Sequence, residues 1–171
     1  MPCNSTTMIR TARQEFDQIL DSLHAQAKAG ATAYQAEQNL FAQLLALGRL
    51  LLEVFFVLCA ERSARQTVRS PDGTVLRMHS WKQRRYVSLF GPVRIERPYF
   101  WARGKGGQIP MDEALSLPDD TYSDLLREQA DLLSAQMAYG QTRAVLERLL
   151  GLSLSTSALK RLVERDAEEV V

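Results

Sequence analysis

Basic and aromatic side chains are concentrated in the middle third of the chain. Residues 61–110 hold eleven Lys and Arg against three Asp and Glu, a local charge of +8, whereas the whole chain carries only +1. Such cations neutralise phosphates, and aromatic rings stack on bases or wedge between them. The residues expected to contact a DNA backbone are Lys82, Arg84, Arg85, Arg94, Arg97, Arg103 and Lys105, interleaved with Trp81, Tyr86, Tyr99, Phe100 and Trp101. The alternative is an ordinary small sheet with an aromatic core and solvated arginines.

A second group of polar side chains falls at the start of the last predicted helix. Thr156, Ser157, Lys160 and Arg161 lie on one face of that helix, suited to phosphate oxygens and base edges. The segment Gln141–Val163 reads as helix, glycine-containing turn and helix, the pattern in which the second helix enters the major groove. A plain helical bundle is the alternative, because residues 111–171 carry twelve acidic against six basic side chains.

Phosphate-loop and carboxylate chemistry are not predicted. The run Gly104-Lys105-Gly106-Gly107 lacks the rest of the Walker pattern, and no helix start with Ser or Thr follows its lysine. The adjacent carboxylates Asp112-Glu113 and Asp119-Asp120 are at loop or helix-start positions, where acidic residues usually serve as caps. We therefore expect no catalytic residue, no metal site and no cofactor in this chain.

Histidine and cysteine usage supports the same expectation. His24 and His79 are the two histidines, and no triad arrangement around either is evident. Cys3 and Cys59 are too far apart in sequence to form a metal-spaced pair. Few cysteines and no secretory signal pattern are typical of a reducing compartment, so we expect a cytoplasmic location.

Two long helices are predicted for the N-terminal segment. Apolar residues recur in steps of three and four over Met8–Ala29, and a broader apolar pattern covers Thr32–Arg65. The breadth of the second pattern indicates burial on several sides, either by dimerisation of the helical pair or by packing against the following segment. Its most apolar part, Leu40–Ala60, is interrupted by polar and charged residues, so we expect a buried helix and no membrane span.

The spacing of apolar residues changes from helical to the two-residue alternation of strands after a turn at residues 70–73. This turn contains Pro71 and Gly73. Residues 85–89 and 93–97 alternate around Gly91-Pro92 and predict a β-hairpin. The glycine-rich residues 103–107 then indicate a flexible loop.

Helical periodicity returns in the C-terminal segment. A short helical turn is expected within Met111–Pro118, then a helix capped by Asp120 or Thr121, a break at Gly140, and helices on both sides of Gly151, the last capped by Ser155. The predicted fold class is α+β, mostly α. It has a helical segment at 1–65, a basic β-hairpin region at 66–110 and a helix-turn-helix-like segment at 111–171.

The order of these parts resembles a known family. The residues that carry the likeness are Gly91-Pro92-Val93-Arg94-Ile95-Glu96-Arg97-Pro98-Tyr99-Phe100, then Pro110 to Pro118, then Tyr122-Ser123-Asp124-Leu125 onward to Ser155-Thr156-Ser157. Over about Arg65 to Glu169 the sequence resembles the N-terminal, pre-catalytic region of ISKra-type insertion-sequence transposases. The resemblance implies binding of double-stranded DNA at the element ends.

The chain departs from that family at two places. Many members have cysteines after the tyrosine–aromatic pair, where this sequence has Trp101-Ala102-Arg103-Gly104, so no zinc is expected. The family's RNase H-like catalytic domain, with its acidic triad, would follow Val171. We therefore expect this chain alone not to cut or join DNA, although it could form part of an enzyme completed by such a domain. The alternative function is an oligomerising or inhibitory helical protein without a direct role on nucleic acid.

Overall fold

The chain forms two compact units. The structure is a computed structural model that describes the backbone of residues 4–169 and the side chains of residues 4–163. Unit 1 comprises residues 1–85 and 94–117, and unit 2 comprises residues 86–93 and 118–171. These boundaries differ from the three expected segments because one end of the β-hairpin packs with the C-terminal helices. The predicted fold class, α+β with mostly helix, is confirmed.

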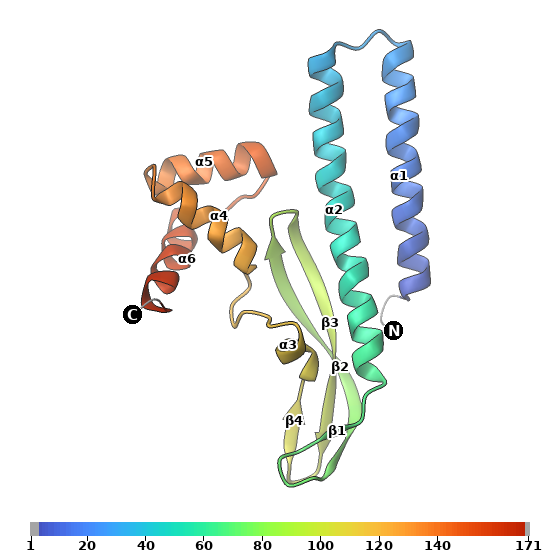
Figure 1. Cartoon of the computed structure of the whole chain (residues 1–171), viewed down its shortest axis with the longest axis vertical. Helices are drawn as coiled ribbons and strands as arrows, with labels where there is room; N and C mark the ends of the chain where they lie inside the picture. Colours follow the sequence, from blue (N-terminus) through green and yellow to red (C-terminus); the bar gives the residue numbers. More distant parts are fainter. Residues whose placement is uncertain (1–3, 170–171) are drawn as a thin grey trace. The chain divides into compact units, whose positions relative to one another are not determined.

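Unit 1 begins with two antiparallel helices that lie side by side, α1 (Ser5–Lys28) and α2 (Ala33–Ala64) (Figure 1). Their apolar periodicity predicted both, although α1 begins three residues before the expected start. Asn4 caps α1 by accepting a hydrogen bond from the Thr6 amide. Thr32 and Gln35 form a capping box at the start of α2. Each cap satisfies amides that the first helical turn leaves without partners.

The expectation that α2 is buried on several sides is confirmed for two of its faces and wrong for a third. Its buried side chains are Leu47, Val54, Phe56, Ala60 and Ser63, while other large apolar residues along it are about half exposed. Leu47 and Val54 are buried on the face toward α1, and Phe56 and Ala60 are buried on a further face, which leaves another stretch of apolar surface uncovered. By length and composition alone α2 could cross a membrane, a test that core helices of soluble proteins also pass.

The strands of unit 1 and the hairpin tip, residues 86–93, form one four-stranded sheet. Its strand order is β1-β2-β3-β4. Its strands are β1 (Val68–Arg69), β2 (Val75–Ser88), β3 (Gly91–Ala102) and β4 (Gly106–Gln108). The predicted turn at residues 70–73 is confirmed, with Gly73 at φ 86° and its amide bonded to the Ser70 carbonyl. The predicted hairpin is confirmed as β2 and β3, which are longer than expected and meet at Leu89 and Phe90 rather than at Gly91-Pro92.

The structure does not have the flexible loop that the sequence predicts at residues 103–107. Residues 103–105 make a tight turn, and β4 then pairs antiparallel with β3, placing Trp101 opposite Gly107. Gly104 and Gly106 adopt φ of 74°, which explains why glycines occupy this turn. Beyond β4, the short helix α3 (Pro110–Ala114) confirms the predicted helical turn and contacts α2.

Unit 2 contains three helices, α4 (Asp124–Ser134), α5 (Tyr139–Leu150) and α6 (Thr156–Glu169) (Figure 1). Their shared core is formed by Ala130, Leu146, Leu154, Leu159 and Leu162. The predicted helix end at Gly151 is confirmed by its left-handed φ of 65°, and the predicted Ser155 cap by a bond from the Ala158 amide to its Oγ.

Two predicted boundaries in this segment are wrong. Ser123, rather than Asp120 or Thr121, caps α4, because the Asp120 carboxylate accepts the Tyr122 amide and the Thr121 carbonyl accepts the Val87 amide. The break between α4 and α5 lies at residues 135–138, not at Gly140, which is inside the first turn of α5.

The hairpin tip belongs to unit 2 because Val87 is bound there twice. Its amide donates to the Thr121 carbonyl, and its carbonyl accepts from the Ser123 amide. Its side chain is buried in a cluster with Leu126 and Leu152. A single strand thus supplies side chains to both units.

Candidate nucleic-acid interface

Three aromatic rings lie together on the exposed face of the sheet in unit 1. His79 is on β2, and Tyr99 and Trp101 are on β3. The His79 ring centroid is 6.3 Å from that of Tyr99 in an edge-on arrangement and 5.8 Å from that of Trp101. Because side chains alternate along a strand, Phe100 points to the other face and is buried with Val68 and Leu76. The buried residue fixes the strand, and the residues on either side of it present their rings outward.

Cationic side chains surround these rings. Lys82 Nζ lies 5.3 Å from the centroid of the Tyr99 ring, within range for a cation–π contact. Arg77 and Arg103 line a shallow hollow of about 350 Å³ together with Val75, Met78, His79, Trp101 and Ala102. We call Arg77, His79, Lys82, Tyr99, Trp101 and Arg103 the aromatic-basic face. All six are at least partly exposed.

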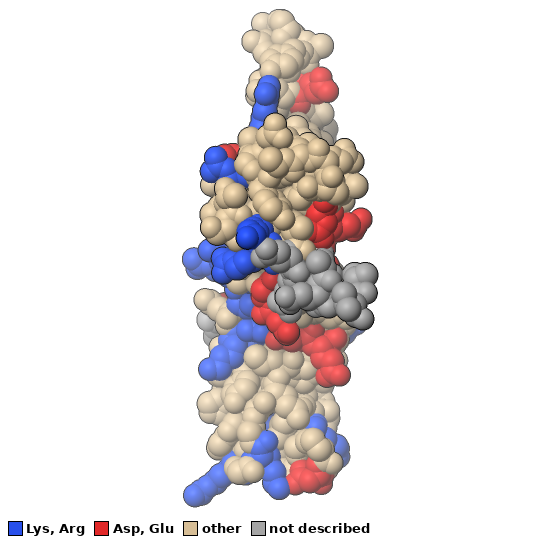
Figure 2. Space-filling view, turned by 90° about the vertical axis from the view of Figure 1, so that its left-hand side faces the viewer, with Lys and Arg blue, Asp and Glu red and all other residues tan. Residues whose placement is uncertain are grey.

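The charge distribution at this end of the sheet is predominantly basic. Figure 2 shows Lys and Arg side chains at the lower end of the view, where the β1–β2 and β3–β4 turns lie, beside a smaller acidic region. The acidic residue in the β1–β2 turn is Asp72, and its carboxylate pairs with Lys105 Nζ at 2.5 Å. The Lys105 ammonium, followed by the Ser70 hydroxyl, holds the pKa of Asp72 well below its usual range. Lys105 is therefore partly neutralised by a local partner.

Gly107 allows the Tyr99 ring to hold its position. The phenol ring of Tyr99 lies directly over Gly107 of β4, and a Cβ at this position would overlap it. A glycine between two strands weakens a sheet unless something packs over it, and here the aromatic ring fills that space. The glycine-rich run is thus part of the aromatic-basic face rather than a phosphate loop.

Lys105 pairs with Asp72, and the other six basic residues predicted for the sheet region divide into two groups in the structure. Lys82, Arg85, Arg94 and Arg103 have exposed side chains. Arg84 and Arg97 instead point toward Asp112 of α3: Arg97 makes a close ion pair with its carboxylate, and Arg84 NH1 lies 3.9 Å from it. Their side chains are only 14% and 12% exposed. We assign these two arginines to the packing of α3 on the sheet rather than to a phosphate contact.

The four predicted base-reading residues lie in unit 2, at the start of α6. Thr156, Ser157, Lys160 and Arg161 are all exposed, while Ala158 and Leu159 between them are buried. The predicted pair of helices with Gly151 in the turn is confirmed, since α5 and α6 contact each other across residues 151–155. The side chain of Arg161 bonds back to the Ser157 carbonyl at 3.4 Å.

The acidic pairs noted in the sequence serve as partners of arginine. The carboxylate of Asp112 forms an ion pair with Arg97. The carboxylate of Asp120 lies 2.9 Å from the guanidinium of Arg127, whose side chain is only 7% exposed. Among the residues that the structure describes, no cluster of three or more His, Cys, Asp and Glu could hold a metal ion.

The sequence predicts no binding role for His79, one member of the aromatic-basic face. Arg77 lies within the basic region 61–110, whose cations the sequence predicts to neutralise phosphates. The available signal was the two-residue alternation of Arg77 with His79 and of Tyr99 with Trp101. The sequence could not show which of the alternating residues face outward, because Tyr99-Phe100-Trp101 places aromatic side chains on both faces of the strand.

Part of the chain is similar to a known protein. The chain is similar to the UPF0236 protein in vanSb 3'region of Streptococcus gallolyticus, with 31% identity over 90 residues. The aligned part is 52% of this chain and 20% of that protein, whose name states no activity. No known protein-family profile matches the chain, and no solved structure matches it significantly.

Proposed function

We propose that this chain binds double-stranded DNA, as the N-terminal, non-catalytic part of an ISKra-type insertion-sequence transposase that recognises the element ends. The observation that carries the binding proposal is the aromatic-basic face. Three adjacent rings flanked by Arg77, Lys82 and Arg103 on one sheet surface combine phosphate neutralisation with stacking or wedging. The transposase assignment is supported by the sequence motifs from Arg65 to Glu169.

Two surfaces with different tasks fit this function. The aromatic-basic face contacts the sugar-phosphate backbone and supplies most of the affinity, which depends little on sequence. The exposed start of α6 supplies sequence preference, because Lys160 and Arg161 reach base edges when a helix of this kind enters the major groove. The acidic composition of residues 111–171 makes α6 a weak anchor without the first surface.

The first experiment measures affinity for a labelled duplex by fluorescence anisotropy. Trp101→Ala and the pair Arg77→Ala with Arg103→Ala are each expected to weaken binding about 10-fold, the loss of one stacking contact or of two phosphate contacts. Arg10→Ala with Lys28→Ala removes the same charge from exposed positions of α1 and is the matched control. Absent binding, or an equal loss in the control, contradicts the proposal.

The second experiment selects bound duplexes from a random pool. Lys160→Ala with Arg161→Ala is expected to flatten the sequence preference of the selected pool while most of the affinity remains. The Arg77→Ala, Arg103→Ala variant is expected to lower affinity for every sequence alike. A pool selected by the wild-type protein without any preferred sequence would contradict the proposed role of α6 in sequence preference.

A further inference from the structure

A regular stripe of apolar residues runs along α2 and is left uncovered. Phe41, Leu44, Leu51, Phe55 and Leu58 are each between 45% and 51% exposed, and Gly48 completes the spacing. We call these six residues the α2 seam. Their steps alternate three, four, three, four and three, which are the a and d positions of a heptad. Such a narrow repeat is the pattern of a helix that packs against another long helix.

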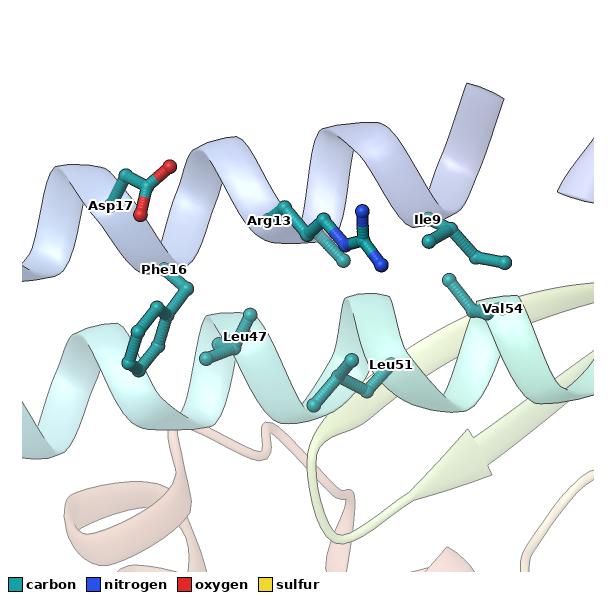
Figure 3. A pocket seen from close by; sticks show the side chains of 8 residues that line it. Ile9, Arg13, Phe16, Asp17, Leu47, Leu51 and Val54 are labelled. Atoms are coloured by element: carbon teal, nitrogen blue, oxygen red, sulfur yellow. The ribbon is translucent and has the colours of Figure 1, made fainter. Parts of the chain in front are cut away.

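The α2 seam is distinct from the faces of α2 that are already packed. Leu47 and Val54 are buried and line the groove between α1 and α2, whereas Phe56 and Ala60 are buried on a further face. Figure 3 shows Leu47, Leu51 and Val54 of α2 facing Ile9 and Phe16 of α1 across that groove. The groove has a volume of about 450 Å³. Leu51 belongs to both the seam and the groove, so the seam continues onto α1.

The exposed apolar area is close to what a stable interface needs. Phe16 and Leu20 of α1, at 50% and 44% exposure, join the five large side chains of the seam. With about 200 Å² for a complete large side chain, the seven leave roughly 670 Å² uncovered. A standard protein interface buries about 800 Å² on each partner, and patches of this size on a lone soluble molecule mark interaction sites.

We propose that the α2 seam binds the α2 seam of a second copy of this chain, with Phe16 and Leu20 at the rim, so that two α1–α2 hairpins form a four-helix bundle. The partner helix must be long, because the seam from Phe41 to Leu58 extends about 26 Å at 1.5 Å per residue. A second α2 has the same length and the same heptad. An isologous pair can therefore cover the whole seam on both copies.

A lipid surface fits this stripe less well. Midway along α2, Arg49 is exposed and Glu53, one turn later, is half-buried, and at 100° per residue both lie on a face other than the seam. A charge at the centre of a bilayer costs about 2.5–3.5 kcal/mol on insertion scales, and lipid chains impose no heptad spacing. In a four-helix bundle both charged groups remain at the surface while the a and d residues are buried.

The test is sedimentation velocity of the full chain without detergent or DNA. The wild-type protein is expected to be a dimer at micromolar concentration, and Leu51→Asp to weaken dimerisation at least about 30-fold, the effect of losing a central interface residue. Leu132→Asp, at an equally exposed leucine of α4, is the matched control and is expected to remain a dimer. Circular dichroism verifies helix content, and Leu44→Gln replaces Leu51→Asp if that variant unfolds.

Three results would overturn the proposal: a wild-type monomer at about 100 μM, equal weakening by Leu132→Asp, or a dimer that persists in folded seam variants. Vesicles of phosphatidylcholine and phosphatidylglycerol provide the lipid arm of the test. A monomer that cosediments with them assigns the α2 seam to a membrane surface instead. Because no DNA is present, failure here is distinguishable from failure of the proposed function.

Discussion

Tyr99 shows how one residue can carry several roles at the aromatic-basic face. Its ring contacts His79 edge-on, receives the Lys82 ammonium and covers Gly107. The amino-acid types at these positions are visible in the sequence, but their assembly depends on β4, which pairs through residues that read as a loop. For the same reason Arg84 and Arg97 could not be separated from their exposed neighbours: Asp112, fifteen residues after Arg97, withdraws them from the surface.

Replacing Gly107 with alanine tests the position of the Tyr99 ring. The added methyl group overlaps the ring, and since the ring is partly exposed it can swing away. We expect a loss of stability below about 1.5 kcal/mol. We also expect loss of the ring-current shift on the His79 protons in NMR spectra and weaker binding to the duplex.

Gly140→Ala is the matched control for that change. A Cβ at Gly140 meets nothing within 4 Å, and the residue lies in the first turn of α5. This variant should leave the His79 resonances and DNA affinity unchanged and should gain a few tenths of a kcal/mol in helix stability. Unaltered His79 shifts in Gly107→Ala would show that the ring is not held as described.

At the scale of elements, periodicity located the helices well and their contacts poorly. The steps of three and four in α1 and α2 predicted both helices within a few residues. The burial of α2 was only partly predicted because a sequence shows how much apolar surface exists but not how much of it the neighbouring elements cover. The start of α4 was misplaced because Asp120 and Thr121, the two predicted caps, stand close to Ser123, and hydrogen bonds to Val87 in a distant strand fix the backbone of Thr121 and Ser123.

The α1–α2 pair is closed at one end by a single carboxylate. Glu61 near the end of α2 accepts hydrogen bonds from the Ser5 amide at 2.9 Å and the Ser5 hydroxyl at 2.8 Å. These bonds, with the Ser5 amide the larger cause, lower the pKa of Glu61 from its ordinary 4.5. Because the folded-state pKa is the lower one, the stability that Glu61 adds is complete above pH 4.5 and is lost as pH falls through its folded pKa.

We therefore expect acid to loosen the start of α1 before the rest of the helical pair. Hydrogen exchange of the amides in the first turns of α1 should accelerate as the pH is lowered below 4.5, after correction for the intrinsic exchange rate. In Glu61→Gln, which cannot ionise, this added pH dependence should disappear. Glu37→Gln, an exposed glutamate of α2, is the control and should retain it. Identical pH profiles for the wild-type protein and Glu61→Gln would contradict the assignment.

For the whole molecule, the net charge of +1 describes neither proposed DNA surface. The sheet region is basic and the C-terminal segment acidic, so the proposed function divides affinity and sequence preference between different parts of one chain. The sequence showed this segregation directly. It could not show that the α2 seam lies outside both DNA surfaces, and this separation makes dimerisation and DNA binding independently testable.

Salt dependence then reports how many copies bind one duplex. The logarithm of the association constant falls with the logarithm of salt concentration by about 0.9 for each phosphate neutralised. If two copies joined by the α2 seam contact the same duplex, the slope for the wild-type dimer should be about twice that for a Leu51→Asp monomer. Arg77→Ala with Arg103→Ala removes two contacts from each copy and should lower the dimer slope by about 3.6 while the protein still sediments as a dimer. Equal slopes for the wild-type protein and Leu51→Asp would mean that one copy contacts each duplex and that the seam serves a purpose other than DNA affinity.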